Sequence, residues 1–177
     1  YSARKIQLTE GTFSLDNDTL GRKPGLDPNH IAIDSLEFEA DSLSFEDKVF
    51  GINIRRFSFS EQSGLKLSSL EGSILSDGTQ LEIPNLQLKT PYSEMQLLVS
   101  APWSSLDEKA EGSIRSLLIA SIGKGDLMLA AGDLSKDFKT YYPNRPVSVT
   151  AGIEGNLDKL ELRGFKAELA GAFKMDA

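Results

Sequence analysis

The sequence has no cysteine, and it has only one histidine and one tryptophan among its 177 residues. The lack of cysteine excludes disulfides, thiolate nucleophiles, and the zinc and iron–sulfur sites that cysteine ligates. A single histidine excludes metal sites built from several histidines. Apolar runs such as residues 117–120 are far shorter than the roughly 20 residues with which a helix crosses a bilayer.

Positive charge is also scarce. The chain has 19 Lys and Arg against 26 Asp and Glu, which gives a formal net charge of −7. A protein that binds nucleic acid neutralises phosphates with a basic surface. We therefore expect no nucleic-acid partner.

Alternation of apolar and polar residues is the dominant pattern that the chain does have. Apolar side chains at every second position lie on one face of a β-strand. The polar residues between them are mainly Ser, Glu, Gln, Lys and Asn, which suit a solvent-facing side. The clearest runs are Ile6-Gln7-Leu8, Phe13-Ser14-Leu15, Ile31-Ala32-Ile33, Leu36-Glu37-Phe38, Leu43-Ser44-Phe45, Ile52-Asn53-Ile54, Phe57-Ser58-Phe59, Leu65-Lys66-Leu67, Leu81-Glu82-Ile83, Leu86-Gln87-Leu88, Met95-Gln96-Leu97, Val147-Ser148-Val149 and Leu160-Glu161-Leu162. The pattern predicts about a dozen strands, each with one apolar face.

Breaks in the alternation predict the loops and one helix. Loops are expected near residues 16–30 and 101–110, which lack any periodicity. Glycines between alternating runs, such as Gly11 and Gly72, are interpreted as turns. A short helix is expected near residues 133–142, where apolar residues share one side and a proline follows.

Strands with one apolar face need a cover, because each exposed Leu, Ile or Phe forgoes roughly 1.5–3 kcal/mol of burial. The sequence predicts almost no helix that could supply that cover. Three arrangements solve the problem: two sheets packed as a sandwich, a sheet closed into a barrel, or a sheet curled around apolar material that is not protein. The predicted fold class is all-β, with an extended, mostly antiparallel, curled sheet and one short helix. A β-sandwich is the alternative.

Three stretches share an eight-residue form, apolar-x-apolar-x-x-apolar-x-apolar. They are residues 31–38, 52–59 and 81–88. The two central x residues shift the alternation by one, so the second half would face the other way unless a bulge restores it. A recurrent bulge would bend each strand and help to curl the sheet.

No motif in the sequence specifies a reaction. Residues 16–27 resemble a calcium loop, but Leu20 stands where an oxygen ligand is needed and Asp27 where a glutamate is usual. His30 has no G-x-S-x-G nucleophile to serve, so a histidine that caps a turn or faces solvent is the simpler interpretation. Residues 123–126 lack the upstream glycine of a phosphate-binding loop. We expect no enzyme, and no catalytic, cofactor-binding or metal-ligating residues.

Four stretches carry a resemblance to a known family. They are Leu26-Asp27-Pro28-Asn29-His30-Ile31 leading into Asp34-Ser35-Leu36-Glu37-Phe38, Ser63-Gly64-Leu65-Lys66-Leu67-Ser68-Ser69-Leu70-Glu71-Gly72, Thr90-Pro91-Tyr92-Ser93-Glu94-Met95-Gln96-Leu97, and Asp133-Leu134-Ser135-Lys136-Asp137-Phe138 ending at Pro143. In these stretches the chain resembles the periplasmic region of bacterial TamB/AsmA-like envelope proteins, in the form found in Bacteroides-type bacteria.

The resemblance implies a long sheet curled into an apolar trough, in the periplasm or cell envelope, with the parent protein anchored in the inner membrane. Family members are implicated in moving phospholipid between the inner and outer membranes and in outer-membrane protein assembly. The implied partners are phospholipid acyl chains or the outer-membrane assembly machinery, and no cofactor is implied. The chain is expected to be a single all-β segment, residues 1–177, of a longer protein.

Candidate lining residues of the trough are apolar positions of the predicted strands. They are Ile31, Ile33, Phe38, Ile52, Ile54, Phe57, Phe59, Leu81, Ile83, Leu86 and Leu88. The alternative function is an adhesion or carbohydrate-binding module of a surface protein. That alternative requires a closed β-sandwich with a dry core.

Overall fold

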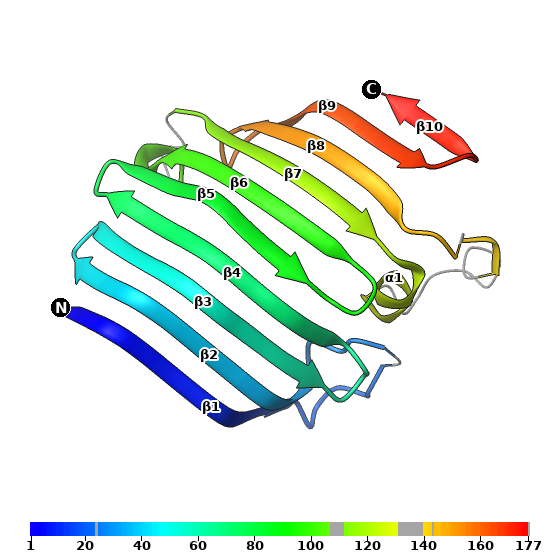
Figure 1. Cartoon of the computed structure of the whole chain (residues 1–177), viewed down its shortest axis with the longest axis horizontal. Helices are drawn as coiled ribbons and strands as arrows, with labels where there is room; N and C mark the ends of the chain where they lie inside the picture. Colours follow the sequence, from blue (N-terminus) through cyan, green and yellow to red (C-terminus); the bar gives the residue numbers. More distant parts are fainter. Residues whose placement is uncertain (24, 107–111, 131–139, 143, 177) are drawn as a thin grey trace.

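One antiparallel β-sheet makes up most of the molecule (Figure 1). The structure is a computed structural model that describes residues 1–23, 25–106, 112–130, 140–142 and 144–176. The strands are β1 (Ser2–Asp16), β2 (His30–Glu46), β3 (Val49–Glu61), β4 (Lys66–Asp77), β5 (Gln80–Lys89), β6 (Glu94–Pro102), β7 (Ile114–Ile122), β8 (Val147–Gly155), β9 (Leu160–Leu169) and β10 (Phe173–Asp176). A 3₁₀ turn, η1 (Trp103–Ser105), follows β6, and a helix, α1 (Lys124–Ala130), follows β7. The predicted all-β class is confirmed.

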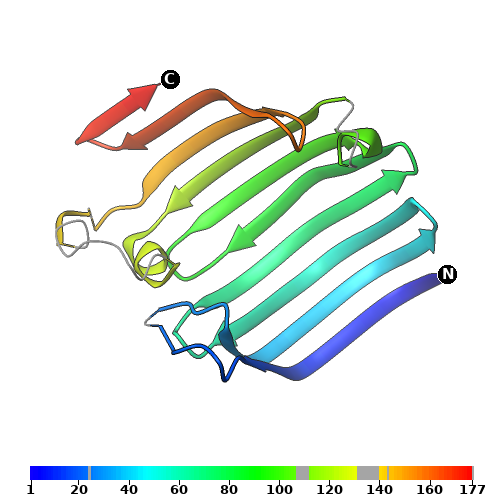
Figure 2. The ribbon, with the colours of Figure 1, turned by 180° about the vertical axis from the view of Figure 1, so that it is seen from behind.

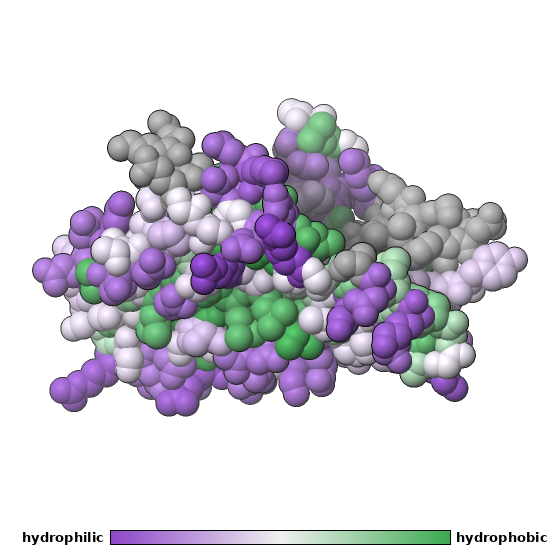
Figure 3. All heavy atoms as spheres, turned by 90° about the horizontal axis from the view of Figure 1, so that it is seen from above, coloured by the Kyte–Doolittle hydropathy of each residue, from purple (hydrophilic) through white to green (hydrophobic). Residues whose placement is uncertain are grey.

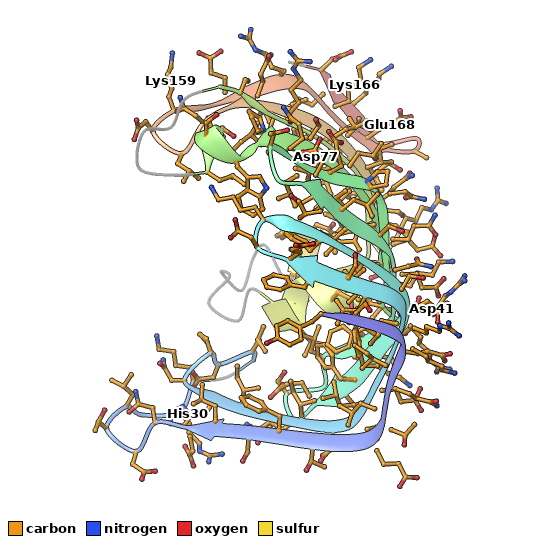
Figure 4. The ribbon with its side chains drawn as sticks, turned by 90° about the vertical axis from the view of Figure 1, so that its left-hand side faces the viewer. His30, Asp41, Asp77, Lys159, Lys166 and Glu168 are labelled. Carbon is orange, nitrogen blue, oxygen red and sulfur yellow. The ribbon has the colours of Figure 1, made fainter. Side chains whose placement is uncertain are left out.

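The sheet is unclosed and curled. Its strands occur in the order of the chain, so β1 and β10 form its two edges. Figure 1 views the convex face and Figure 2 the concave face, and the curl is seen as a C in Figure 4. Every described strand lies in this one sheet, so the β-sandwich alternative is wrong and the curled sheet is confirmed.

Register shifts in the middle of the strands accompany the curl. They fall at the centres of the three eight-residue stretches: between Asp34 and Glu37 on β2, between Ile54 and Phe57 on β3, and between Ile83 and Leu86 on β5. A bulge of this kind bends the strand that carries it. It also lets the apolar residues on both sides of the shift face the same way. The predicted recurrent bulge is confirmed.

Several glycines that the sequence suggested as turns lie inside strands. Gly11 belongs to β1 and Gly72 to β4, so their interpretation as turns is wrong. Gly72 pairs directly with Leu86 and has a φ of +147°. A Cβ atom at Gly72 would lie 2.3 Å from the carbonyl oxygen of Asn85. The glycine therefore permits the close approach of β4 and β5 where the sheet bends.

The connections of the sheet gather along two long rims. The loop of residues 17–29 joins β1 to β2 and has no strand or helix among its described residues. It lies at the same rim as α1, because the Leu26 N–H donates to the Leu129 carbonyl at 3.2 Å. At the opposite rim, β6 continues through Pro102 and η1 follows it. The loop was expected near residues 101–110, but residues 101–105 belong to β6 and η1, so the expected start is too early.

The helical segments also differ from expectation. Residues 133–139 of the helix expected near 133–142 lie outside the described residues, as do residues 107–110 of the second loop. The helix α1 was not predicted, and its start is flanked by two glycines. In the described residues, no helix has the length and apolar character to span a membrane.

Candidate functional site: the concave face of the sheet

The two faces of the sheet can be told apart from the register. Figure 4 shows Asp41 on the outer, convex side. Side chains alternate along a strand, so the neighbouring Ala40 points to the concave side. Ala40 pairs directly with Ile54 of β3. Residues directly opposite each other on adjacent strands share a face, so the register traces the concave side from strand to strand.

Apolar residues form continuous rows across the concave face. One row consists of Ala40, Ile54, Gly72, Leu86, Leu97, Leu118 and Ala151, from β2 to β8. A second row consists of Leu8, Phe38, Phe57, Leu70, Leu88, Met95, Ala120 and Val149, from β1 to β8. The bulges bring all of the candidate lining residues to this face, where each is buried or half-buried.

Aromatic side chains fill two parts of the concave face. The Phe38 and Phe57 rings meet edge to face with centroids 6.1 Å apart, and Phe59 lies 5.7 Å from Phe57. Near the η1 rim, the Phe50 and Trp103 rings are 6.2 Å apart. The Trp103 indole N–H donates to the Ser76 hydroxyl at 2.7 Å, so its polar atom is satisfied.

The apolar lining stays partly open to water, and most of all towards the two edges of the sheet. Exposed fractions reach 51% for Phe13 on β1 and 59% for Leu162 on β9. By contrast, the central Ile54 is 9% exposed. Figure 3 shows hydrophobic residues gathered in a central band that is bordered by hydrophilic ones. The concave face, called the hollow below, is thus an apolar surface. In the described part of the chain, no second sheet covers it.

The convex face is charged and held by cross-strand ion pairs. Lys5 of β1 pairs with Glu39 of β2 at 2.9 Å, and Arg55 of β3 pairs with Asp41 of β2 at 2.6 Å. Exposed pairs of this kind contribute little to stability, because water and salt screen them. Their main effect is to keep this face in water. Leu117 is an exception, because it lies on the convex side and is 36% exposed.

His30 organises the loop of residues 17–29. Its ring is 4% exposed, with Nδ1 2.8 Å from Asp27 Oδ2 and Nε2 3.4 Å from Asp16 Oδ1. The backbone N–H groups of Lys23 and Asn29 also donate to Asp27. The Lys23 N–H, together with His30 and the Asn29 N–H, outweighs burial and lowers the Asp27 pKa from its ordinary 3.8 to about 2. Asp16 and Asp27, the first and last residues of the stretch that resembles a calcium loop, therefore both contact His30. The histidine caps a turn and does not face solvent.

A second carboxylate at this rim stabilises the turn after β3. Burial raises the pKa of Glu61, but hydrogen bonds from Ser63, the Ala32 N–H and the Gln62 N–H outweigh it and lower the pKa overall. The Glu61 side chain accepts from the Ser63 N–H at 2.7 Å. The carboxylate thus accepts hydrogen bonds from the backbone of β2 and of the turn.

The turn between β5 and β6 anchors α1 to the rim. The buried Asp126 carboxylate accepts hydrogen bonds from the hydroxyls of Thr90 and Ser93. The Gly123 N–H donates to the Ser93 hydroxyl at 3.0 Å. A Cβ atom at Gly123 would lie 2.2 Å from the Tyr92 carbonyl oxygen, so a side chain there would push α1 off this turn.

The described residues contain no cluster of three or more His, Asp or Glu side chains that could hold a metal ion. A scan against protein-family models found no matching family, and searches of curated proteins and of solved structures found no match.

Sequence reasoning missed several members of the apolar rows. Met95 and Leu97 lie in one alternating run, which was a usable signal. Leu118 was hidden, because Leu117 and Ile119 beside it are also apolar although they lie on the convex face. A run that is apolar on both faces does not reveal which residue points into the hollow.

Proposed function

We propose that this chain is a non-catalytic lipid-binding segment of a bacterial envelope protein, and that its concave face shields phospholipid acyl chains from water. The observation that carries the proposal is the pair of apolar rows, which cross the sheet without a second sheet over them in the described residues. Acyl chains suit such a surface, because each methylene removed from water is worth about 0.8 kcal/mol.

The side chains of the hollow favour movement of an acyl chain along the sheet over its binding at one fixed position. Its rows consist of aliphatic and aromatic side chains, which offer contacts without direction. An acyl chain that moves from Leu86 to Leu97 exchanges one aliphatic contact for another, so no single position holds it. The headgroup stays in water at the opening of the C, and the charged convex face keeps the segment soluble.

The resemblance to TamB/AsmA-like proteins supports a location in the periplasm and a role in moving phospholipid between two membranes. In this proposal the segment lies in the periplasm, within a longer protein anchored in the inner membrane. It contributes part of a path for phospholipid between the inner and outer membranes.

Lipid extraction tests the proposal. Vesicles of phosphatidylethanolamine and phosphatidylglycerol would carry a self-quenching tail-labelled phospholipid, and the purified chain would be added. Dequenching is expected with the wild type, because the label leaves the bilayer. Leu86→Lys places an ammonium in the hollow and should abolish it, whereas Gln87→Lys on the convex face should not. Equal signals from both variants would contradict the proposal.

A further inference from the structure

An apolar pocket of about 410 Å³ lies on the concave side of the sheet, between α1, the end of β7 and the starts of β8 and β10. It is lined by Ile122, Leu127, Tyr141, Tyr142, Val147, Val149 and Phe173. Each of these side chains is aliphatic or aromatic. The volume is near the lower end of the about 300–1,000 Å³ range of small-molecule sites. It therefore suits one alkyl chain and not the two tails of a phospholipid.

Two cations lie beside this pocket. Ile122 and Val147 are direct partners in the sheet, and Lys124 and Arg145 lie two residues beyond them at the same rim. The Lys124 ammonium donates to the carbonyl of Tyr142, a pocket residue, at 3.1 Å. In the described part of the chain, neither cation has a carboxylate within ion-pair distance.

The nearest acidic group on α1 does not neutralise them. Asp126 is buried, and its carboxylate is occupied by the hydroxyls of Thr90 and Ser93. Among the described residues, the rim therefore presents two cations without an ion-pair partner next to an apolar pocket, in a chain whose net charge is −7. A ligand that matches both features has one alkyl chain and an anionic head.

We propose that this pocket binds a fatty acid, with its alkyl chain in the pocket and its carboxylate on Lys124 and Arg145. The inference rests on the proposed function, because the ligand would reach the pocket along the concave face. It adds a site with a fixed position and charge preference to a face that otherwise lets chains slide. A guanidinium and an ammonium together bind a carboxylate through charge-assisted hydrogen bonds.

Calorimetric titration of the purified chain with decanoate, dodecanoate and dodecanol tests the site. Each added methylene should tighten binding about fourfold. Dodecanoate should bind about tenfold more tightly than dodecanol. The double variant Lys124→Gln/Arg145→Gln should remove that tenfold preference. Equal affinities for dodecanoate and dodecanol in the wild type would overturn the proposal.

Filling the pocket provides a second test. Val149→Trp should abolish binding of both ligands, whereas Leu117→Trp, on the convex face, should bind them as the wild type does. Unchanged dodecanoate binding by Val149→Trp would also overturn the proposal. If the chain extracts phospholipid but shows no saturable dodecanoate binding, this site is rejected and the proposed function stands. If the chain binds dodecanoate but extracts no phospholipid, only the proposed function is rejected.

Discussion

Arg55 and Arg56 are consecutive residues of β3, yet both side chains reach the convex face. Arg55 Nε lies 2.6 Å from Asp41 Oδ2, and Arg56 Nε lies 3.1 Å from Glu37 Oε2. In a regular strand, neighbours point to opposite faces. The bulge between Ile54 and Phe57 removes that constraint and keeps both arginines out of the hollow.

Deletion of Arg56 should therefore reverse the second half of β3. Removing the extra residue sends Phe57 and Phe59 towards the convex face, because a one-residue slip exchanges the faces of a strand. We expect a loss of about 2–3 kcal/mol in the free energy of unfolding, measured by urea titration. Arg56→Ala keeps the bulge and should cost less than about 1 kcal/mol. Similar losses for both variants would show that the bulge does not set the face.

Gly72→Ala should destabilise the bend between β4 and β5. The added Cβ would meet the Asn85 carbonyl oxygen at 2.3 Å, in a backbone conformation with φ of +147°. We expect a loss of about 1–3 kcal/mol in thermal or urea unfolding. Gly21→Ala is the matched control, because its Cβ would meet nothing within 4 Å, and it should stay within about 0.5 kcal/mol of the wild type. A Gly72→Ala protein as stable as the control would contradict the close approach.

Acid should loosen the loop of residues 17–29 through Asp27. Its folded-state pKa of about 2 is below the ordinary 3.8, so its stabilisation is present above pH 3.8 and is lost as the pH falls through 2. Thermal melts of the wild type and Asp27→Asn should therefore differ most at pH 5 and converge near pH 2. A gap between the two proteins that is the same at pH 5 and pH 2 would show that the Asp27 charge plays no part.

Leu117 and Leu118 are neighbours that should respond differently to the same change. Leu118 belongs to the concave row, and Leu117 is partly exposed on the convex face. Leu118→Lys places a charge among apolar side chains and should cost about 1–3 kcal/mol. Leu117→Lys should stay within about 0.5 kcal/mol of the wild type. Chemical unfolding measures both, and the reverse ranking would exchange the two faces of β7.

Much of the fold could be predicted from period-two alternation. The alternation identified the strands, and the two central residues of the eight-residue form, Arg55-Arg56 and Pro84-Asn85, identified the bulges. These signals are local, because they depend on the pleat of a single strand. Strand length was harder to predict, because a bulge and a turn both interrupt the alternation. Gly72 was for this reason mistaken for a turn.

The features that depend on tertiary contact could not be predicted. The site of α1 is set by the Asp126 carboxylate, whose partners Thr90 and Ser93 lie more than 30 residues earlier. The role of His30 likewise depends on Asp16 at the end of β1, which the antiparallel pairing of β1 with β2 places directly opposite it. Candidate lining residues were found by pattern, but their common face became evident only from the cross-strand register.

Photo-crosslinking on the two faces of one strand tests the central claim most directly. A diazirine amino acid at Ile54 or Leu86 faces the hollow, and at Asn53 or Gln87 it faces outward. The chain would be irradiated with phosphatidylethanolamine and phosphatidylglycerol vesicles and analysed by mass spectrometry. We predict phospholipid adducts at Ile54 and Leu86 and none at Asn53 and Gln87. Crosslinks from Ile54 and Leu86 to neighbouring strands alone, or equal lipid adducts on both faces, would contradict an acyl-chain trough.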